Sequence, residues 1–245
     1  MSMPLTSKTY SLSQVHSIAR QGDAIRLNNE ICKACVDEVL IDFKGKTVLD
    51  VACGHENPFF KERLQLAKHV IGLDQDSREI QRNQFIHEGH VGDIHAMPLP
   101  GESVDVVVSV DTIEHAAEPD LFLKECHRVL RAGGEAVFAT PNLLGYKNAF
   151  AKFCGKNVFD FTWRASHHRV LEYGTFYRCN TAGTFRQRAE DAGFKIITIS
   201  YVPEISWFLS THPIAFTLAH VYNRVTGQLG LERLWGYMVV RAVKV

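Results

Sequence analysis

Residues 48–57 read Val48-Leu-Asp-Val-Ala-Cys-Gly-His-Glu-Asn57, and this stretch decides the fold. It begins as a short β-rich run and passes into a turn of small residues, Ala52-Cys53-Gly54. Such a turn after a buried strand lets backbone amides approach a ligand at the start of the next helix. Twenty residues after Gly54, Asp74 closes a second apolar run, His69–Leu73. A carboxylate at that place can accept hydrogen bonds from both hydroxyls of a ribose.

Strand-like and helix-like segments alternate outward from this unit. We expect strands at 47–52, 69–73, 91–94, 104–110, 135–139, 194–201 and 235–245, and helices at 58–66, 77–85, from 119 to the Gly133-Gly134 pair, and 181–192. The run Val104–Val110 is apolar and β-branched, as strands buried on both faces of a parallel sheet are. The alternation predicts an α/β fold with a doubly wound parallel sheet.

Two segments break the alternation. Residues 142–180 are irregular and rich in aromatic side chains, and a second, apolar segment begins at residue 202. We therefore expect an N-terminal helical cap over residues 1–46 and one domain over residues 47–245, with insertions at about 142–180 and 202–234.

The composition excludes several classes of protein. The 27 Lys and Arg residues balance the 27 Asp and Glu residues, so the chain lacks the charge that attracts nucleic acid. The N-terminus has no signal-peptide pattern, and Pro213 and two histidines interrupt the uncharged stretch Ile205–Asn223, which argues against a transmembrane segment. We expect a cytoplasmic protein with six reduced cysteines and no metal. The composition does not set the oligomeric state.

Further motifs follow the later strands. The carboxylate of Asp93, in Gly92-Asp93-Ile94, can reach an adenine amino group while Ile94 packs on its ring. The motif Val110-Asp-Thr-Ile-Glu-His115 follows the strand over 104–110, at the carboxyl edge where such sheets place their ligands. Last, the run Arg128-Val-Leu-Arg-Ala-Gly-Gly134 leads to the motif Thr140-Pro-Asn142.

As an ordered set, VLDVACG, GLDQD, GDI, DTIEH, RVLRAGG and TPN resemble a class I methyltransferase that depends on S-adenosylmethionine (SAM), of the type 11 group that includes the ubiquinone-biosynthesis O-methyltransferases. The resemblance covers residues 47–142. It implies a Rossmann-like, seven-stranded, mostly parallel sheet with an antiparallel last strand and helical insertions. It also implies that a methyl group moves from SAM, by in-line displacement, to an oxygen or nitrogen of a small-molecule acceptor. The two insertions would form the acceptor site, and an aromatic, sugar or lipid-linked metabolite would suit them.

The resemblance assigns the cofactor contacts residue by residue. Asp50 and the turn 52–54 would hold the methionine end of SAM, and Asp74 would hold the ribose. The full set expected to contact SAM is Asp50, Ala52, Cys53, Gly54, Asp74, Gln75, Asp93, Ile94, Val110 and Asp111. The chain departs from the family at Ala52 and Glu56, where glycines are usual. Glu56 would bring a negative charge near the methionine carboxylate, unless the turn differs, the side chain points away, or it pairs with the amine.

A hydroxyl acceptor must lose its proton, so a base would accelerate its methylation by about 10²–10⁴-fold. The candidates are His115, after the strand over 104–110, and His167 and His168, in the first insertion. Each also has a purely structural interpretation, and a neutral amine acceptor needs no base.

Two alternatives lie outside methyl transfer. A nicotinamide-dependent dehydrogenase would share the first strand and Asp74, but this assignment leaves the later motifs unexplained. A non-catalytic SAM-fold binding protein in a biosynthetic complex is the second alternative, and Glu56 is its best support. A nucleic-acid acceptor is disfavoured by the neutral charge and by the absence of an Asn-Pro-Pro-Tyr motif.

Overall fold

The computed structural model describes residues 33, 37, 39, 41–57, 59–145, 174–203, 205 and 213–245. The chain divides into two compact units. The sheet unit comprises Val39–Thr140, Gly174–Ile199 and Val239–Val245, and the insertion unit comprises Met1–Glu38, Pro141–Tyr173 and Ser200–Met238. Most of the predicted N-terminal helical cap, together with His167 and His168, lies outside the described residues.

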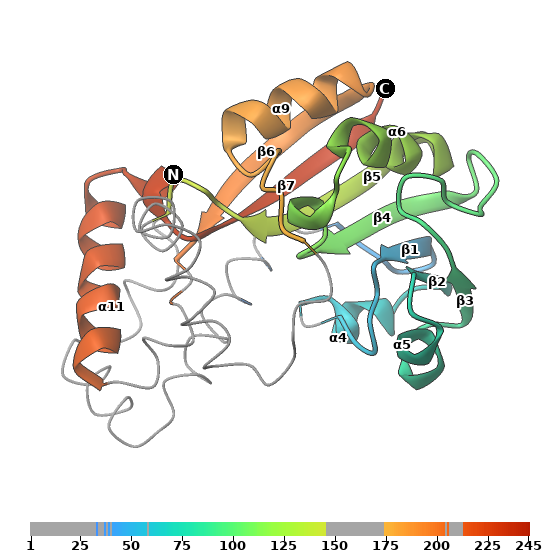
Figure 1. Cartoon of the computed structure of the whole chain (residues 1–245), viewed down its shortest axis with the longest axis horizontal. Coiled ribbons are helices and arrows are strands. Elements are labelled where there is room, and N and C mark those ends of the chain that lie inside the picture. The colour runs from blue at the N-terminus through green and yellow to red at the C-terminus, as the bar shows by residue number, and fades with distance from the viewer. Residues whose placement is uncertain are drawn as a thin grey trace. The chain divides into compact units, whose positions relative to one another are not determined.

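Seven strands form one sheet in the order β3-β2-β1-β4-β5-β7-β6 (Figure 1). The strands are β1 (Thr47–Val51), β2 (His69–Asp74), β3 (Glu88–Val91), β4 (Val104–Val110), β5 (Leu130–Pro141), β6 (Phe194–Val202) and β7 (Tyr237–Lys244). The strands from β3 through β5 pair in parallel, and β7 is antiparallel. This architecture confirms the predicted fold class. Chain order reverses between β1 and β4, which is where open α/β sheets place their ligands.

Helices cover both faces of the sheet. The described helices of the sheet unit are α4 (Lys61–Leu64), α5 (Ser77–Arg82), α6 (Pro119–Val129) and α9 (Ala182–Asp191), with the 3₁₀ turn η1 (Ile113–His115). The insertion unit contains α11 (Pro213–Gln228) and the 3₁₀ turn η2 (Glu232–Leu234). Figure 1 shows α6 and α9 along one face and α5 on the other, against β2 and β3. The ion pair between Asp120 and Arg188 joins α6 to α9.

The core under α6 and α9 is built around Phe138, in the middle of β5. The apolar residues Phe122, Leu123, Cys126 and Val129 of α6 are buried. The Phe122 ring meets the Phe138 ring edge-on, with centroids 6.1 Å apart. Phe185 of α9 and Phe194 of β6 lie 5.3 and 6.1 Å from the same ring. Aromatic pairs at such distances add to the free energy gained by burial.

Three predicted elements differ in the structure. The third strand lies at Glu88–Val91 rather than 91–94, because this edge strand has one neighbour, is mostly exposed and carries no apolar pattern. The first helix is a single turn, Lys61–Leu64, rather than 58–66. Gly133 and Gly134 lie within β5, since α6 already ends at Val129.

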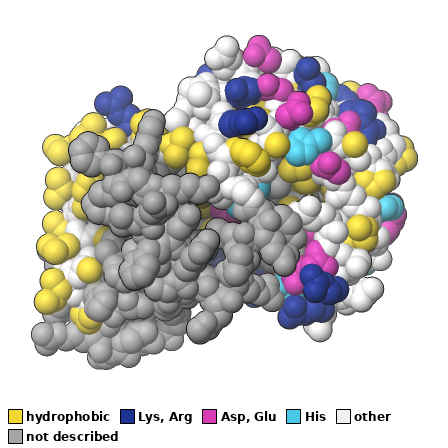
Figure 2. Space-filling model, in the orientation of Figure 1, with side chains coloured by type: hydrophobic (Ala, Val, Ile, Leu, Met, Phe, Trp, Pro, Cys, Tyr) yellow, Lys and Arg dark blue, Asp and Glu magenta, His cyan; other side chains and the backbone are white. Residues whose placement is uncertain are grey.

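In the insertion unit, α11 buries a face of mixed polarity: Phe216, Ala219, His220, Asn223 and Thr226. Four apolar side chains of this helix and of the residue after it are 45–70% exposed: Ile214, Leu218, Val225 and Leu229. Apolar side chains appear along this helix at the left edge of Figure 2. No helix within the described residues is long and apolar enough to cross a membrane.

Gly193, which follows α9, shows how tightly this face is packed. Its φ is +97°, and an added Cβ would lie 2.7 Å from Nε2 of His127 on α6. We expect Gly193→Ala to lower the free energy of unfolding by about 2–4 kcal/mol through backbone strain and overpacking. Urea denaturation measures this. Gly183→Ala is the matched control, since its Cβ would meet nothing within 4 Å and alanine favours the helix. Equal stability of the two variants would contradict the packing argument.

Candidate functional site

The carboxylate of Asp50 lies buried in β1, one strand residue before the small-residue turn. Its side chain is 1% exposed, and its Oδ1 accepts a hydrogen bond of 2.8 Å from Nδ2 of Asn57. Among the described residues, no donor reaches the other oxygen, Oδ2. A buried carboxylate oxygen without a donor is costly and points to a ligand that supplies one.

The environment of Asp50 holds its pKa near neutrality. Burial raises the pKa of this carboxyl to about 7, the hydrogen bond from Asn57 lowers it, and the charge of Asp74 raises it. Two carboxylates therefore share this end of the sheet. Burial and the same two charges raise the pKa of the Cys53 thiol to about 12, so this thiol is neutral.

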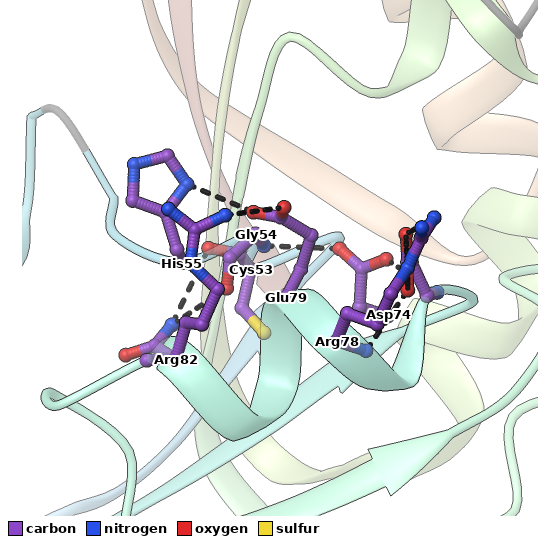
Figure 3. A network of polar contacts seen from close by, with 9 residues as sticks. Cys53, Gly54, His55, Asp74, Arg78, Glu79 and Arg82 are labelled. Atoms are coloured by element: carbon purple, nitrogen blue, oxygen red, sulfur yellow. Dashed lines mark hydrogen bonds and ion pairs between the residues drawn. The ribbon is translucent and has the colours of Figure 1, made fainter.

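The backbone amides of Cys53 and Gly54, in the turn, already donate hydrogen bonds within the protein. The Cys53 amide donates to the Leu73 carbonyl at 3.1 Å, and the Gly54 amide donates to Oδ2 of Asp74 at 2.9 Å. The Nδ2 group of Asn83, at the end of α5, donates to the carbonyls of Cys53 and Gly54. Figure 3 shows how these contacts join the turn to the end of β2 and to α5. Side chains, rather than the Cys53 and Gly54 amides, are left to hold a ligand.

Asp74 ends β2 at the same edge of the sheet. Oδ2 takes the Gly54 amide and Oδ1 takes the Asp76 amide at 2.9 Å. Each carboxylate oxygen accepts two hydrogen bonds, so one position on each oxygen suits a ribose hydroxyl. Gln75, beside it, is exposed.

Glu56 points away from the turn, which is one of the three alternatives that the sequence left open. Its carboxylate pairs with Nζ of Lys61 at 3.1 Å on the exposed surface. The neighbouring His55 binds Glu79 of α5 through Nδ1 at 2.8 Å (Figure 3). Glu56 therefore brings no unpaired charge to the turn.

The other expected cofactor contacts follow the strands β3 and β4. Asp93 is exposed and accepts hydrogen bonds from the backbone and ring of His95, which hold its pKa below the usual range. Ile94 and Val110 are half-buried. Asp111 is exposed at a φ of +49°, and its amide donates to the Ala139 carbonyl. Their contact with SAM stays a prediction.

His115 lies in η1, after β4, with an orientation suited to a base. Its Nδ1 lies 3.1 Å from the carbonyl oxygen of Gly174. Because a carbonyl only accepts, Nδ1 must carry the proton, and Nε2 of the neutral ring keeps its lone pair. His167 and His168, the other expected bases, are not among the described residues.

The segment 174–180 is held against the residue before His115. The Glu114 carbonyl accepts from the amides of Phe176 and Tyr177, at 2.7 and 3.2 Å. The buried Glu114 carboxylate accepts from the Thr140 hydroxyl at 3.0 Å, and that hydroxyl accepts from Asn180 at 2.7 Å. Burial and the charges of Glu114 and Asp111 raise the pKa of Tyr177 to about 12. The motifs DTIEH and TPN thus meet the end of the first insertion.

Sequence reasoning missed three buried polar residues of the site: Asn57, Asn83 and Glu114. Two of them, Asn57 and Glu114, lie inside quoted motifs, but no spacing rule separates a buried amide from an exposed one. Asn83 lies inside the helix predicted at 77–85, whereas the structure ends α5 at Arg82 and makes Asn83 its C-cap.

The charges of this site suit one class of nucleoside ligand. Asp50 and Asp74 favour a cation with ribose hydroxyls, and SAM carries an ammonium and a sulfonium. A pyrophosphate would instead need free turn amides, and those of Cys53 and Gly54 are occupied. The residues present therefore fit SAM and not a nicotinamide dinucleotide.

The fold and the site together define the class I methyltransferase type of Rossmann-like protein. A SAM-dependent methyltransferase from Mesorhizobium loti superimposes with a TM-score of 0.57, 17% identity, and coverage of 85% of this chain and 95% of that one. At that identity the likeness shows the fold alone.

Residues 49–138 match the family described as "Methyltransferase domain". A protein of Mycolicibacterium smegmatis named as a probable S-adenosylmethionine-dependent methyltransferase is 38% identical over 106 residues, which are 42% of this chain and 40% of that protein. The ubiquinone biosynthesis O-methyltransferase of Sinorhizobium fredii is 29% identical over 131 residues, 51% of this chain and 52% of that enzyme.

Residues 49–138 resemble the type 11 family of SAM-dependent methyltransferases, and the matched relatives indicate distant homology to the ubiquinone-biosynthesis O-methyltransferases. The family implies SAM as the cofactor. The matched regions span 40–52% of the length of these two curated relatives.

Ala52, where the family usually has glycine, has a φ of +55°. A left-handed conformation costs an alanine about 1–2 kcal/mol, and a glycine loses about 0.5–1 kcal/mol more entropy on folding. We therefore expect Ala52→Gly to raise the free energy of unfolding by about 0.5–1 kcal/mol. Thermal unfolding measures this change. Ala132→Gly, at an exposed position of β5, is the control and should lose stability. A loss in both variants would mean that the turn tolerates alanine without strain.

Proposed function

We propose that this protein transfers a methyl group from SAM to an oxygen or nitrogen of a small-molecule acceptor. The observation that carries the proposal is the buried Oδ2 of Asp50, which finds no donor among the described residues. It lies beside a turn whose Gly54 amide is bound to Asp74. An ammonium near Asp50 and a ribose near Asp74 would satisfy both carboxylates.

Bound SAM supplies a methyl carbon already activated by the sulfonium. The protein then has to bind and orient SAM and the acceptor and to exclude water, because the acceptor atom must come within about 3–3.5 Å of that carbon. Asp50 and Asp74 would anchor the two ends of the cofactor, and the strand-end residues Asp93, Ile94, Val110 and Asp111 would frame its base and floor. Anchoring both ends limits where the methyl group can point.

An oxygen acceptor is favoured over a nitrogen. The Nδ1 contact of His115 with the Gly174 carbonyl leaves Nε2 free to take a hydroxyl proton, which an amine acceptor would not require. The relatives named as ubiquinone biosynthesis enzymes are O-methyltransferases. An aromatic, sugar or lipid-linked metabolite is the proposed acceptor, and His167 and His168 are proposed to contact it.

The first experiment is thermal unfolding with SAM, with S-adenosylhomocysteine and, as a control, with NADH. A ligand at 100 times its dissociation constant stabilises by about 2.7 kcal/mol, which raises the Tm of a domain of this size by about 5–10 °C. A rise with the first two ligands alone supports the proposal, and labelled methyl transfer to panels of hydroxyl and amine compounds then identifies the acceptor. Binding without turnover on any acceptor would favour the non-catalytic alternative.

Asp74→Ala tests the cofactor assignment. We expect the dissociation constant of SAM to rise at least tenfold, because both the ribose contact and the anchor of the Gly54 amide are lost. Calorimetry measures it. Asp76→Ala is the control: it removes a nearby carboxylate that caps α5 and binds Arg78, so it lowers stability modestly and leaves SAM affinity within threefold. An unchanged constant in Asp74→Ala would remove the assignment.

His115→Gln tests the proposed base once a hydroxyl acceptor is identified. We expect kcat to fall about 10²–10⁴-fold while the dissociation constant of SAM stays within twofold. His90→Gln, on the edge strand β3, is the matched control and should retain full kcat. Full activity of His115→Gln would show that another group accepts the proton.

A further inference from the structure

Asn57 holds the Asp50 carboxylate from one side only. The Asn57 side chain is 3% exposed, and its Nδ2 donates to Oδ1 of Asp50 at 2.8 Å. Its own oxygen accepts from the amides of Phe59 and Phe60, at 3.2 and 3.0 Å. The amide plane of Asn57 is therefore fixed at both ends.

This arrangement selects which oxygen of Asp50 faces a ligand. Because Asn57 occupies Oδ1, the carboxylate cannot rotate without losing a buried hydrogen bond, and Oδ2 stays without a donor from the described residues. An asparagine can donate to Asp50 and accept from Phe59 and Phe60 at once. Neither an aspartate nor a leucine, both of similar size, can do so.

We propose that Asn57 is a positioning residue that presents Oδ2 of Asp50 to the ammonium group of SAM. The inference deepens the proposed function and rests on it. It goes beyond capping. The hydrogen bond from Asn57 favours the ionised form of the Asp50 carboxylate and orients it for a cation, while the other end of Asn57 is bound to the chain entering α4 (Lys61–Leu64).

Capping and positioning make different demands on residue 57. Capping needs only an acceptor for the two amides, which an aspartate provides. Positioning needs a donor toward Asp50, which an aspartate lacks, and the new charge would raise the pKa of Asp50. The other titratable groups that act on Asp50 are Asp74, whose charge also raises its pKa, and the neutral thiol of Cys53.

The test is Asn57→Asp, with S-adenosylhomocysteine as the probe because it keeps the amino-acid end of SAM. Calorimetry between pH 6 and 8 should show an affinity at least tenfold weaker than wild type at pH 7. The wild-type affinity should rise with pH until about 7, as Asp50 ionises. In the variant the rise should begin at higher pH and continue to the end of the range. Because aspartate keeps the acceptor that capping needs, loss of the donor toward Asp50 and the added charge are what would shift this profile.

Two further variants serve as controls for this test. Gln84→Glu adds the same charge at an exposed position nearby and should bind within twofold of wild type. The double variant Asp50→Asn with Asn57→Asp preserves the hydrogen bond in the reverse direction, so it should fold even where Asn57→Asp alone is unstable, and it should still bind at least tenfold more weakly.

The outcomes separate the two claims. Suppose that the wild-type protein binds the probe. If Asn57→Asp then keeps the wild-type affinity and pH profile, or if the double variant regains the wild-type affinity, the role of Asn57 is overturned and the proposed function stands. Absence of binding by the wild-type protein overturns both.

Discussion

The structure depends on the parallel pairing of β1 with β2 on one side and β4 on the other. In this register Asp50 lies opposite Gly72 of β2 and Val108 of β4. Parallel strands end at the same edge, so the turn after β1, the carboxylate that ends β2 and the loop that follows β4 meet there. Each of these segments has a different role, but the shared edge is what makes them one site.

Burial of charge at this edge explains its specificity. The carboxylates of Asp50 and Asp74 act on one another, and the first is withdrawn from water with one oxygen unpartnered among the described residues. Such an arrangement is unfavourable for the free protein and favourable once a cation arrives. Meanwhile the turn amides of Cys53 and Gly54 are bound to β2, so neither is open to an anion. Under the proposed function, this edge of the sheet would receive a positively charged nucleoside instead.

A second buried carboxylate, Glu114, organises the residues that the proposed function places on the acceptor side. Through its backbone and side chain it joins the residues after β4 to Thr140 at the end of β5 and to the segment 174–180. His115 takes its orientation from the same segment, through Gly174. The ring is therefore positioned by a residue that the chain reaches only toward the end of the first insertion.

The sequence by itself determined the fold class and the positions of Asp50, Asp74 and His115 after or near the ends of strands, because buried parallel strands leave long apolar runs and their ends carry short motifs. It misplaced β3 and overextended the first helix, where exposed or single-turn elements leave no periodic signal. Only the tertiary structure decided that Asn57, Asn83 and Glu114 support the site and that Glu56 turns away to Lys61. Those outcomes depend on contacts between residues far apart in the chain or on the direction of a single side chain, and no spacing along a sequence encodes either.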